Sequence, residues 1–551
     1  MPDKSSRPRH SRSGSRSGSH SASGRRSSLP RLKSSPRLVR TISAEIDAVS
    51  QDINHLKLES DSSSLSLEVP FVKGTLNASL PLEYLRTDVL NLAQALKVPK
   101  WHNSNSGNSR KTNVMTHLVP KSVVLTKITG ALTNAIFRVQ YPGLPSLLLR
   151  VYGPQVDSII DRDYELQVLA RLSAHNIGPK LYGCFTNGRF EQFLEDSKTL
   201  TKDDIRNWKT AQRIARRMKE LHSGVPLLPF EIARGPSTWL RLEKWVKVIN
   251  DSPWSHDAGN IQKVLTCQDW QFFLMAMQKY RKWLEETYKD THSGLVFCHN
   301  DAQHGNLLFT APVASLPATP SVSADSIKTS DSLFPTASNV SLEQIIRPSP
   351  QEQKQDSKLV VIDFEYSGAN RPAFDLANHF SEWMCDYNSA DSYKSDETKY
   401  PTKEELLNFL YSYASHRRTS RDRSIDDEVK DLYNDVIRQR ASVSLHWATW
   451  AIIQSGELND SPQKKVVEEG PGGEKYVITI DDEDNEDGDE DHADADGEAL
   501  HEGADIESFD NLKFAKDKMA LFWGDMLQLG LLKREELPNF VSIKSLDTKF
   551  L

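Results

Sequence analysis

The stretch VFCHNDAQHGNLLF, from Val296 to Phe309, places two histidines, an aspartate and two asparagines between two apolar runs. So many polar groups in one turn can serve a metal site, a catalytic loop or a structural turn. A second stretch helps to decide among these. The run LVVIDFEYSG, residues 359 to 368, lies downstream and carries Asp363 at the end of an apolar segment.

The two stretches together match the motif order of the protein-kinase fold, which is HxDxxxxN followed by a strand and Asp-Phe. Here Asp301 and Asn306 are five residues apart, and DFE replaces DFG at Asp363. Phosphoryl transfer needs a carboxylate at the acceptor hydroxyl and oxygen ligands for Mg²⁺ at the phosphates. Asn306 and Asp363 supply the hard oxygens that Mg²⁺ prefers. The pairing therefore favours a phosphotransferase site over a turn that Asp301 merely caps.

A zinc site built on His299 and His304 fits the pattern less well. Their five-residue gap suits no helical ligand pair, and no third soft ligand is spaced to join them. We expect His299 to support the loop and His304 to have no specific role. The cysteines form no CxxC pair, which argues against a disulfide framework or a zinc finger and suits a reducing compartment. They are Cys184, Cys267, Cys298 and Cys385.

Length and charge predict folded lobes joined to solvated segments. The 551 residues are too many for one core, and only 38% are hydrophobic. Residues 1–40 hold eleven Lys and Arg against one acid, and residues 481–498 hold twelve acids and no base. Neither block can bury enough apolar surface to fold alone. No run is long and apolar enough to span a bilayer and no signal peptide is present, so we expect a cytoplasmic protein.

The order of predicted elements indicates an α+β, protein-kinase-like fold with two lobes. Strand, glycine turn, strand, helix and two further strands suit a small β-rich lobe, and helical periodicity dominates after it. A helix is expected from Leu80 to Leu96. We predict a disordered basic tail at residues 1–68, an N-terminal segment at 69–118 and a small lobe at 119–200. The helical lobe is expected to span residues 201–551, with disordered insertions at 311–357 and 456–505.

The motifs closely resemble those of the choline/ethanolamine kinase family. The likeness rests on VFCHNDAQHGNLLF together with VVIDFEYSGANRPAFDLANHFSEW, and it continues through GPKLYGCF and GRFEQFL to cover most of residues 120–550. Residues 70–101 resemble the N-terminal segment of the fungal members, which implies a fungal source. The resemblance implies Mg²⁺-dependent transfer of the γ-phosphate of ATP to choline. Its product, phosphocholine, would feed phosphatidylcholine synthesis by way of CDP-choline.

The resemblance also implies roles for individual residues. Asp301 would be the catalytic base, with Gln303 near the reaction centre, and Asn306 and Asp363 would hold Mg²⁺. Arg150 would meet the phosphates in place of a protein-kinase lysine, with Glu165 placed to pair with it. The phosphate-covering turn, which has a single glycine, and the adenine hinge would complete the ATP site with Thr129, Gly130, Leu132, Thr133, Asn134, Gln192, Phe193 and Leu194.

The acceptor pocket is expected to be an aromatic cage. A quaternary ammonium cannot donate hydrogen bonds, so it is bound by aromatic faces with a carboxylate nearby. Trp447 and Trp450 are three residues apart and so share a helix face. Ordinary core packing is the alternative explanation for this spacing. By resemblance they form the cage with Glu382, Tyr387 and Phe514, where Phe514 replaces a tyrosine common in the family.

Several alternatives stay open at this stage. An ethanolamine kinase, or a kinase with both activities, needs a similar pocket. A catalytically weak scaffold could use the basic tail to bind polyanions. Homodimers are frequent in the family, and the tail motifs RRSSLP and LVRTIS suit basophilic regulatory kinases. No nucleic-acid partner and no transmembrane segment are expected.

Overall fold

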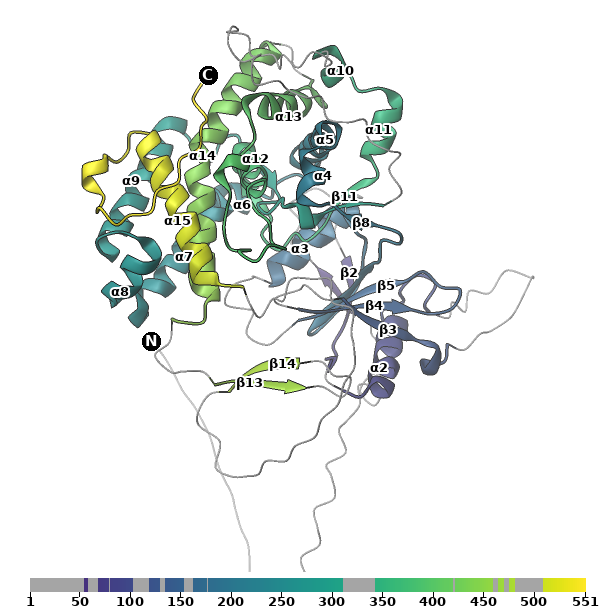
Figure 1. Ribbon diagram of the computed structural model, residues 1–551. Helices are drawn as coiled ribbons and strands as arrows, with labels where there is room; N and C mark the ends of the chain where they lie inside the picture. Colours follow the sequence, from purple (N-terminus) through teal and green to yellow (C-terminus); the bar gives the residue numbers. More distant parts are fainter. Residues whose placement is uncertain are drawn as a thin grey trace, which may run out of the picture. The chain divides into compact units, whose positions relative to one another are not determined.

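The two motifs lie in a structure built from a mixed sheet and a helical lobe (Figure 1). The computed structural model describes residues 54–57, 68–78, 80–102, 118–128, 134–152, 162–175, 177–310, 342–419, 422–458, 464–469, 475–480 and 509–551. Its architecture confirms the predicted α+β, protein-kinase-like fold. None of the helices in these ranges is long and apolar enough to cross a membrane.

A seven-stranded sheet forms the small lobe. Its spatial order is β1-β2-β6-β7-β5-β4-β3, with β2 and β6 parallel and the other pairs antiparallel. The strands are β1 (Asn54–Lys57), β2 (Glu68–Val72), β3 (Val124–Ile128), β4 (Asn134–Gln140), β5 (Leu147–Tyr152), β6 (Leu181–Phe185) and β7 (Gly188–Gln192). The backbone of β1 thus lies within the predicted tail yet pairs with β2.

Alternating apolar residues explain how this sheet packs. Phe137 and Val139 of β4 point to the same face as Leu149 of β5, and all three are buried. Helix α2 (Leu82–Ala95) packs its apolar stripe, including Val89 and Leu92, into the same core. The helix predicted between Leu80 and Leu96 is therefore confirmed. Helix α3 (Arg162–Ala174) follows β5 in the chain.

The second lobe is mainly helical, and the long helix α14 is its centre. Helix α14 packs against α7, α12, α13 and α15 (Figure 1). The helices are α4 (Lys202–Arg206), α5 (Trp208–Gly224), α6 (Pro229–Arg234), α7 (Ser237–Asn250), α8 (Ala258–Asn260), α9 (Trp270–Tyr288), α12 (Pro372–Glu382), α13 (Lys403–Ser415), α14 (Ile425–Gln454) and α15 (Asn511–Gln528).

Short strands hold the two motifs side by side. Strand β9 (Val296–Cys298) pairs with β12 (Gly368–Asn370), and β10 (Leu307–Phe309) pairs with β11 (Leu359–Val361) and β8 (Lys198–Thr199). The catalytic-loop stretch runs from β9 to β10, while the DFE stretch runs from β11 to β12. Because β9 pairs with β12 and β10 pairs with β11, the two connections begin and end beside each other.

The first predicted insertion is shorter than the sequence suggested. Helices α10 (Leu342–Ile346) and α11 (Pro350–Asp356) fold within residues 311–357. Ser349 and Glu352 form a capping box with Pro350 at the first helical position, so the Ser and Pro content that suggested disorder includes a helix start. Asp356 forms a buried bidentate pair with Arg216 at 2.6 and 2.8 Å. The prediction of disorder therefore does not hold for residues 342–357.

Other parts of the predicted disordered segments fall outside the described residues. These are residues 1–53, 58–67, 311–341, 459–463, 470–474 and 481–505, the last of which contains the acidic run. Within the second predicted insertion, the backbone forms an antiparallel pair, β13 (Lys464–Glu469) with β14 (Lys475–Ile480).

Candidate active site

The catalytic loop is held from behind by one buried carboxylate of α12. Asp375 accepts hydrogen bonds from the backbone N–H groups of His299 and Asn300, both at 2.8 Å. Asn300 has a φ of 65°, a left-handed conformation that asparagine tolerates better than most residues. His299 is bonded through Nε2 to the carbonyl of Ile362 at 2.8 Å, which confirms its supporting role. The loop backbone that carries Asp301 is therefore held by α12 through Asp375 and by the DFE stretch through the carbonyl of Ile362.

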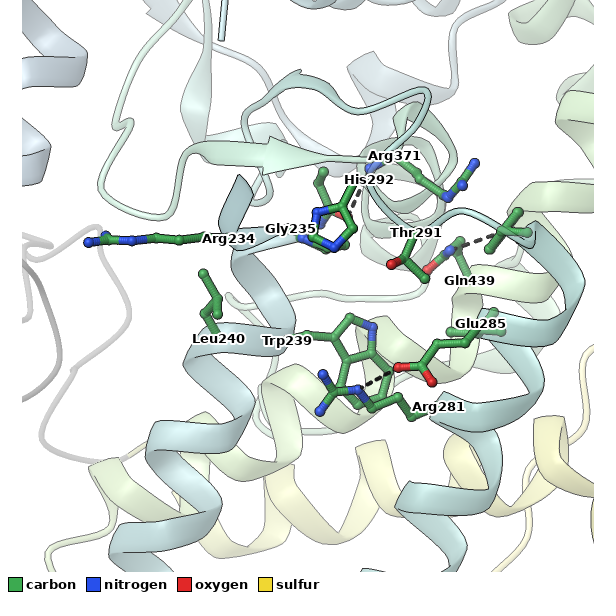
Figure 2. Close-up of a pocket in the computed structure, with 14 residues that line it drawn as sticks. Arg234, Gly235, Trp239, Leu240, Arg281, Glu285, Thr291, His292, Arg371 and Gln439 are labelled. Carbon is green, nitrogen blue, oxygen red and sulfur yellow. Dashed lines mark hydrogen bonds and ion pairs between the residues drawn. The ribbon is translucent and has the colours of Figure 1, made fainter. Parts of the chain in front are cut away.

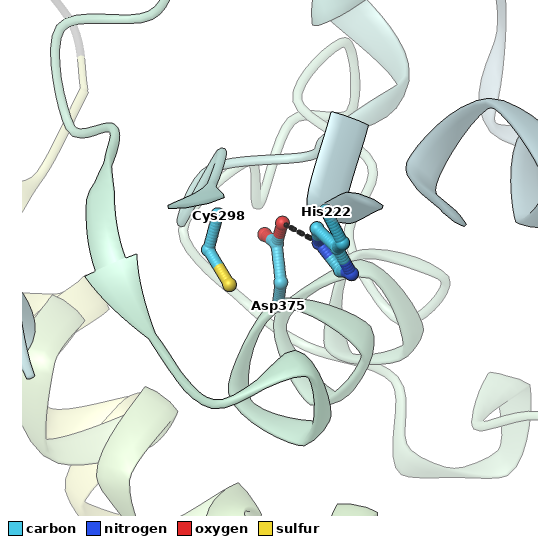
Figure 3. Close-up of side chains that lie close together, drawn as sticks. All are labelled: His222, Cys298 and Asp375. Atoms are coloured by element: carbon cyan, nitrogen blue, oxygen red, sulfur yellow. Dashed lines mark hydrogen bonds and ion pairs between the residues drawn. The ribbon is translucent and has the colours of Figure 1, made fainter. Parts of the chain in front are cut away.

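Asp375 lies between His222 and Cys298 (Figure 3). Its carboxylate is 2.9 Å from His222 Nε2, and Nδ1 of that imidazole is 2.7 Å from the Tyr413 hydroxyl. Burial by itself would raise the pKa of Asp375, but the hydrogen bond and charge of His222 hold it below its ordinary value. Burial raises the pKa of Cys298 well above its ordinary value, so the thiol stays protonated.

Three potential metal ligands thus lie within 4.8 Å of one another in this cluster. However, both oxygens of Asp375 already accept backbone hydrogen bonds, and both nitrogens of His222 have partners. The cluster is therefore a support for the catalytic loop. The sequence analysis missed Asp375, although a charged residue within the apolar helix segment AFDLANHF was a usable signal.

Asp301 faces a concentration of negative charge. Burial raises its pKa well above the ordinary value, and the nearby carboxylates of Glu382, Asp363 and Glu365 raise it further. The side-chain amide of Asn306 donates to the Asp301 carboxylate and to its carbonyl, both at 2.9 Å. Four carboxylates around one buried point form a site that is stabilised by binding cations.

The residues present fit a hard divalent cation. Asp363 has a φ of 63°, and its Oδ1 is buried with no hydrogen-bond partner among the described residues. The amide nitrogen of Asn306 is used by Asp301, so its oxygen is the atom left for a metal. An orphaned carboxylate oxygen and an amide oxygen suit Mg²⁺. Asn306 and Asp363 are the residues that would hold it.

Arg150 of β5 extends toward the same carboxylate. Its Nη1 lies 3.7 Å from Asp363 Oδ1, and its Nε lies 3.9 Å from Glu191. Glu165 of α3 forms its ion pair with Arg189 of β7 at 2.9 Å, which corrects the expected pairing with Arg150. The cause is the register of the sheet, because Arg150 and Arg189 are directly opposite on paired strands. Arg150 is thus available to the phosphates.

The remaining nucleotide residues are only partly described. Thr129, Gly130, Leu132 and Thr133 lie outside the described residues, and the backbone of Asn134 begins β4. The hinge follows β7: the N–H of Gln192 donates to the Lys180 carbonyl at 2.8 Å, and the Leu194 carbonyl accepts from the Ser197 hydroxyl at 2.8 Å. The Arg138 guanidinium lies 4.5 Å from the centre of the Phe193 ring. The hinge is therefore held to the rest of the protein by backbone groups of Gln192 and Leu194 and by the ring of Phe193.

Two tryptophans of α14 meet edge to face near the acidic centre. The ring centres of Trp447 and Trp450 are 5.6 Å apart at an interplanar angle of 78°. The Trp447 indole N–H donates to Asn378 at 2.7 Å, and that of Trp450 donates to the Tyr366 hydroxyl at 2.8 Å. Tyr366, which the sequence analysis did not select, also contacts Trp447, with ring centres 5.4 Å apart. Both indoles are thus oriented by buried hydrogen bonds.

The other predicted acceptor residues form two contacts, one of which includes Trp450. The Tyr387 hydroxyl donates to Glu382 at 2.9 Å, and Phe514 contacts Trp450 with ring centres 6.4 Å apart. His304 stacks on Tyr387, with ring centres 5.9 Å apart and an interplanar angle of 19°. Its pKa is lowered by burial, so the ring is neutral at neutral pH. His304 therefore supports a wall of the pocket, contrary to the expectation that it has no role.

Phe514 also contacts a cation of the protein itself. The ammonium of buried Lys518 lies 4.7 Å from its ring centre. Burial lowers the pKa of Lys518, but Cys385, Glu382 and Asp517 outweigh this and raise the pKa above its ordinary value. The lysine is therefore charged and occupies part of the Phe514 π surface.

Gln303 lies in the turn beside Asp301. Its N–H donates to the Asp301 carbonyl at 2.9 Å, and its own carbonyl accepts from the N–H of Asn306 at 3.1 Å. This backbone closes the turn between the predicted base and the predicted metal ligand.

Acid should destabilise the protein through His379, whose ring is bonded to the Ala302 carbonyl at 2.8 Å. Burial lowers its pKa from 6.5 to about 4, so between these values the unfolded chain takes up a proton that the folded protein does not. Unfolding is therefore favoured as the pH falls through this window. His379→Asn, which can keep the bond but cannot titrate, should lose about 2 kcal/mol less stability than the wild type between pH 7 and pH 5.

Urea unfolding of both proteins at the two pH values measures this difference. The other buried histidines should keep their share of the pH dependence in the variant. Equal losses in wild type and variant would show that His379 is not the group responsible.

Comparisons with known proteins agree with this geometry. The family model described as choline/ethanolamine kinase matches residues 125–523, and the model described as choline kinase N terminus matches residues 60–106. The choline kinase of Saccharomyces cerevisiae is 49% identical, with 95% of each chain covered. The ethanolamine kinase of the same yeast is 38% identical, covering 88% of this chain and 84% of its own.

A solved choline kinase from Cryptosporidium parvum, 19% identical, covers 81% of this chain and 97% of its own with a TM-score of 0.49. The family models and the yeast relatives span both lobes and all the motifs described above. This chain belongs to the choline/ethanolamine kinase family of phosphotransferases.

Proposed function

We propose that this protein is an ATP-dependent choline kinase that produces phosphocholine and ADP. The observation that supports the proposal most directly is the indole pair of Trp447 and Trp450, oriented by hydrogen bonds beside the acidic centre. Aromatic faces with a nearby carboxylate suit a quaternary ammonium, which offers no hydrogen-bond donor. Glu382, whose charge acts on Asp301, supplies that carboxylate. The choline hydroxyl would then face Asp301.

In the proposed reaction Asp301 accepts the proton of the choline hydroxyl as the oxygen attacks the γ-phosphorus of ATP. Asn306 orients the Asp301 carboxylate through its amide hydrogen bond. Arg150 binds the phosphates from β5. Mg²⁺, held by Asn306 and Asp363, would offset the charge that develops on the phosphate oxygens. The raised pKa of Asp301 makes it a stronger base, and bound cations favour its ionised form.

A coupled assay of ADP release tests this proposal and its alternatives. Purified protein with Mg²⁺ and ATP should release ADP when choline is added, with a higher kcat/KM for choline than for ethanolamine. A clearly higher kcat/KM for ethanolamine would overturn the choline assignment in favour of an ethanolamine kinase. No release with either amino alcohol would favour the weak scaffold.

The cage has its own prediction. Trp450→Leu should raise the KM for choline by roughly 10- to 30-fold, because it removes a desolvated cation–π contact. The KM for ethanolamine should rise less, since a primary ammonium also donates hydrogen bonds to carboxylates. Steady-state kinetics with both substrates measure the two values. Trp283→Leu, on α9, is the matched control and should leave both KM values unchanged; an unchanged choline KM in Trp450→Leu would exclude this indole from the cage.

The proposed dependence on Mg²⁺ rests on the fit of Asn306 and Asp363 to the ion. We also propose a cytoplasmic location, which the sequence predicts, and a homodimer, which is frequent in the family. Metal titration of the assay, fluorescence microscopy of the tagged protein and sedimentation velocity test these in turn. Phosphorylation of the basic tail by regulatory kinases stays a prediction for residues outside the described ranges.

A further inference from the structure

A second pocket, bounded by α3, α6 and α7, is strongly basic. Arg234, Arg241 and Lys244 line it together with the hydroxyl-bearing residues Tyr164 and Ser237. We call it the Arg241 pocket. It contains none of the residues assigned above to ATP, Mg²⁺ or the acceptor.

Arg241 is held by neutral groups on one side of its guanidinium, and its Nη1 has no hydrogen-bond partner among the described residues. Its Nη2 donates to the carbonyls of Tyr366 and Ser367 at 2.6 and 3.2 Å, and these are neutral acceptors. Its Nη1 is buried without a hydrogen-bond partner. No carboxylate among the described residues forms an ion pair with it. Burial lowers the pKa of Arg241, and the negative charge of Glu365 opposes this shift only in part. A partly buried charge without a close counterion gains from binding an anion.

The acid that lines the same pocket does not neutralise these cations. Glu231 forms a bidentate pair with Arg171 at 2.7 and 2.9 Å and accepts a hydrogen bond from the Tyr164 hydroxyl at 2.5 Å. Its charge is therefore already matched by Arg171. Ser237 accepts a hydrogen bond from the side chain of Asn300 at 3.2 Å, which leaves its own hydroxyl proton for another acceptor.

The neighbouring pocket between α7 and α9 provides a contrast (Figure 2). Arg281 there forms ion pairs with Glu243 and Glu285. Arg371 donates to the Asp290 carbonyl at 2.9 Å and lies 3.6 Å from the centre of the Tyr288 ring. Arg234 extends away from the other lining residues in this view. Arg281 is therefore compensated by carboxylates, whereas Arg371, like Arg241, is bonded to a backbone carbonyl and lies near a tyrosine ring.

We propose that the Arg241 pocket binds the phosphate group of a small molecule, either inorganic phosphate or a phosphate monoester. The pocket offers two guanidiniums, one ammonium and one hydroxyl donor, which are more donors than a single carboxylate needs. They match the charge and the several acceptor oxygens of a phosphate dianion. The proposal does not depend on the identity of the acceptor substrate.

Two contacts connect this pocket to the active site. Arg241 binds the carbonyl of Tyr366, whose hydroxyl accepts the hydrogen bond of Trp450. Ser237 holds Asn300, which directly precedes Asp301. A phosphate bound between Arg241 and Ser237 would touch the supports of both the cage and the base. We therefore expect its binding to change the KM for choline.

Phosphate binding to the full-length protein tests the proposal. The nucleotide site is first saturated with Mg²⁺ and a non-hydrolysable ATP analogue, so that added phosphate cannot report on that site. Inorganic phosphate is then titrated at constant ionic strength, and binding is followed by calorimetry and by the unfolding midpoint. We expect saturable binding that chloride does not reproduce. Glycerol 3-phosphate, titrated in parallel, distinguishes the two sources: tighter binding than phosphate assigns a monoester, and equal binding assigns the phosphate group alone.

Variants locate the binding. Arg241→Gln should weaken phosphate binding at least about tenfold, because it removes a charge-assisted hydrogen bond to the phosphate. Since Arg241 also holds backbone carbonyls, the exposed double variant Arg234→Gln/Lys244→Gln provides a test that spares the fold and should weaken binding by a similar factor. Lys247→Gln, an exposed lysine of α7 that does not line the pocket, is the matched control and should bind normally. Absence of phosphate-specific binding, or wild-type affinity in the double variant, would overturn the proposal.

Discussion

Asp301→Asn is expected to lower kcat for choline-dependent ADP release by about 10³-fold, the range for loss of a general base. The amide keeps the size of the carboxylate and can still bond to Asn306, but it cannot accept the hydroxyl proton. Because the wild-type carboxylate is buried among Glu382, Asp363 and Glu365, removing its charge should not destabilise the fold. The unfolding midpoint should be equal to or above that of the wild type.

The control for this variant is an acid that is assigned no role in the site. The side chain of Asp386 is 35% exposed and is paired with Lys202, so Asp386→Asn should keep kcat within a few-fold of the wild type. Coupled ADP assays at saturating ATP and choline compare the three proteins. If Asp301→Asn retains activity within tenfold of the wild type, Asp301 is not the base.

Asp363→Ala should have an effect of similar size through the metal. The variant removes the buried oxygen that has no hydrogen-bond partner among the described residues and that faces Arg150 at 3.7 Å. Metal stabilisation of the transferred phosphoryl group is worth several kcal/mol, so kcat/KM should fall by about 10³-fold. The Mg²⁺ concentration needed for half-maximal rate should also rise.

The dependence on Mg²⁺ separates this effect from a folding defect. Initial rates are measured over a Mg²⁺ titration, and binding of the Mg²⁺-loaded ATP analogue is measured by calorimetry. Asp391→Asn, which changes an exposed acid outside the site, should behave as the wild type. An unchanged Mg²⁺ requirement in Asp363→Ala would remove Asp363 from the metal site.

Much of the site could be predicted from the sequence because its chemistry is local. The interval between Asp301 and Asn306 is one turn of chain, and the amide of Asn306 bonds to the carboxylate as that spacing suggests. Trp447 and Trp450 share a helix face for the same reason, since three residues are close to one helical turn. The strand before Asp363 was readable from its apolar run. Each of these features depends on periodicity along a short segment.

Contacts between distant segments were not readable in this way. Glu165 forms its ion pair with Arg189 because strand register places that arginine opposite Arg150, and register depends on the whole sheet. Asp375 supports the catalytic loop from 75 residues away, and Asp356 is paired with Arg216 across 140 residues. Spacing in the chain carries no information about such partners.

The sequence by itself determined the family and the two lobes and predicted the proposed base and metal ligands, because these follow from motifs of a few residues each. Only the tertiary structure decided which charges are compensated. It placed the ammonium of Lys518 over the Phe514 ring, left Nη1 of Arg241 without a hydrogen-bond partner among the described residues, and packed α10 and α11 against α13 and α5. The physical reason is that the free energy of a buried charge depends on all the groups around it in space, and folding brings those groups from separate parts of the chain.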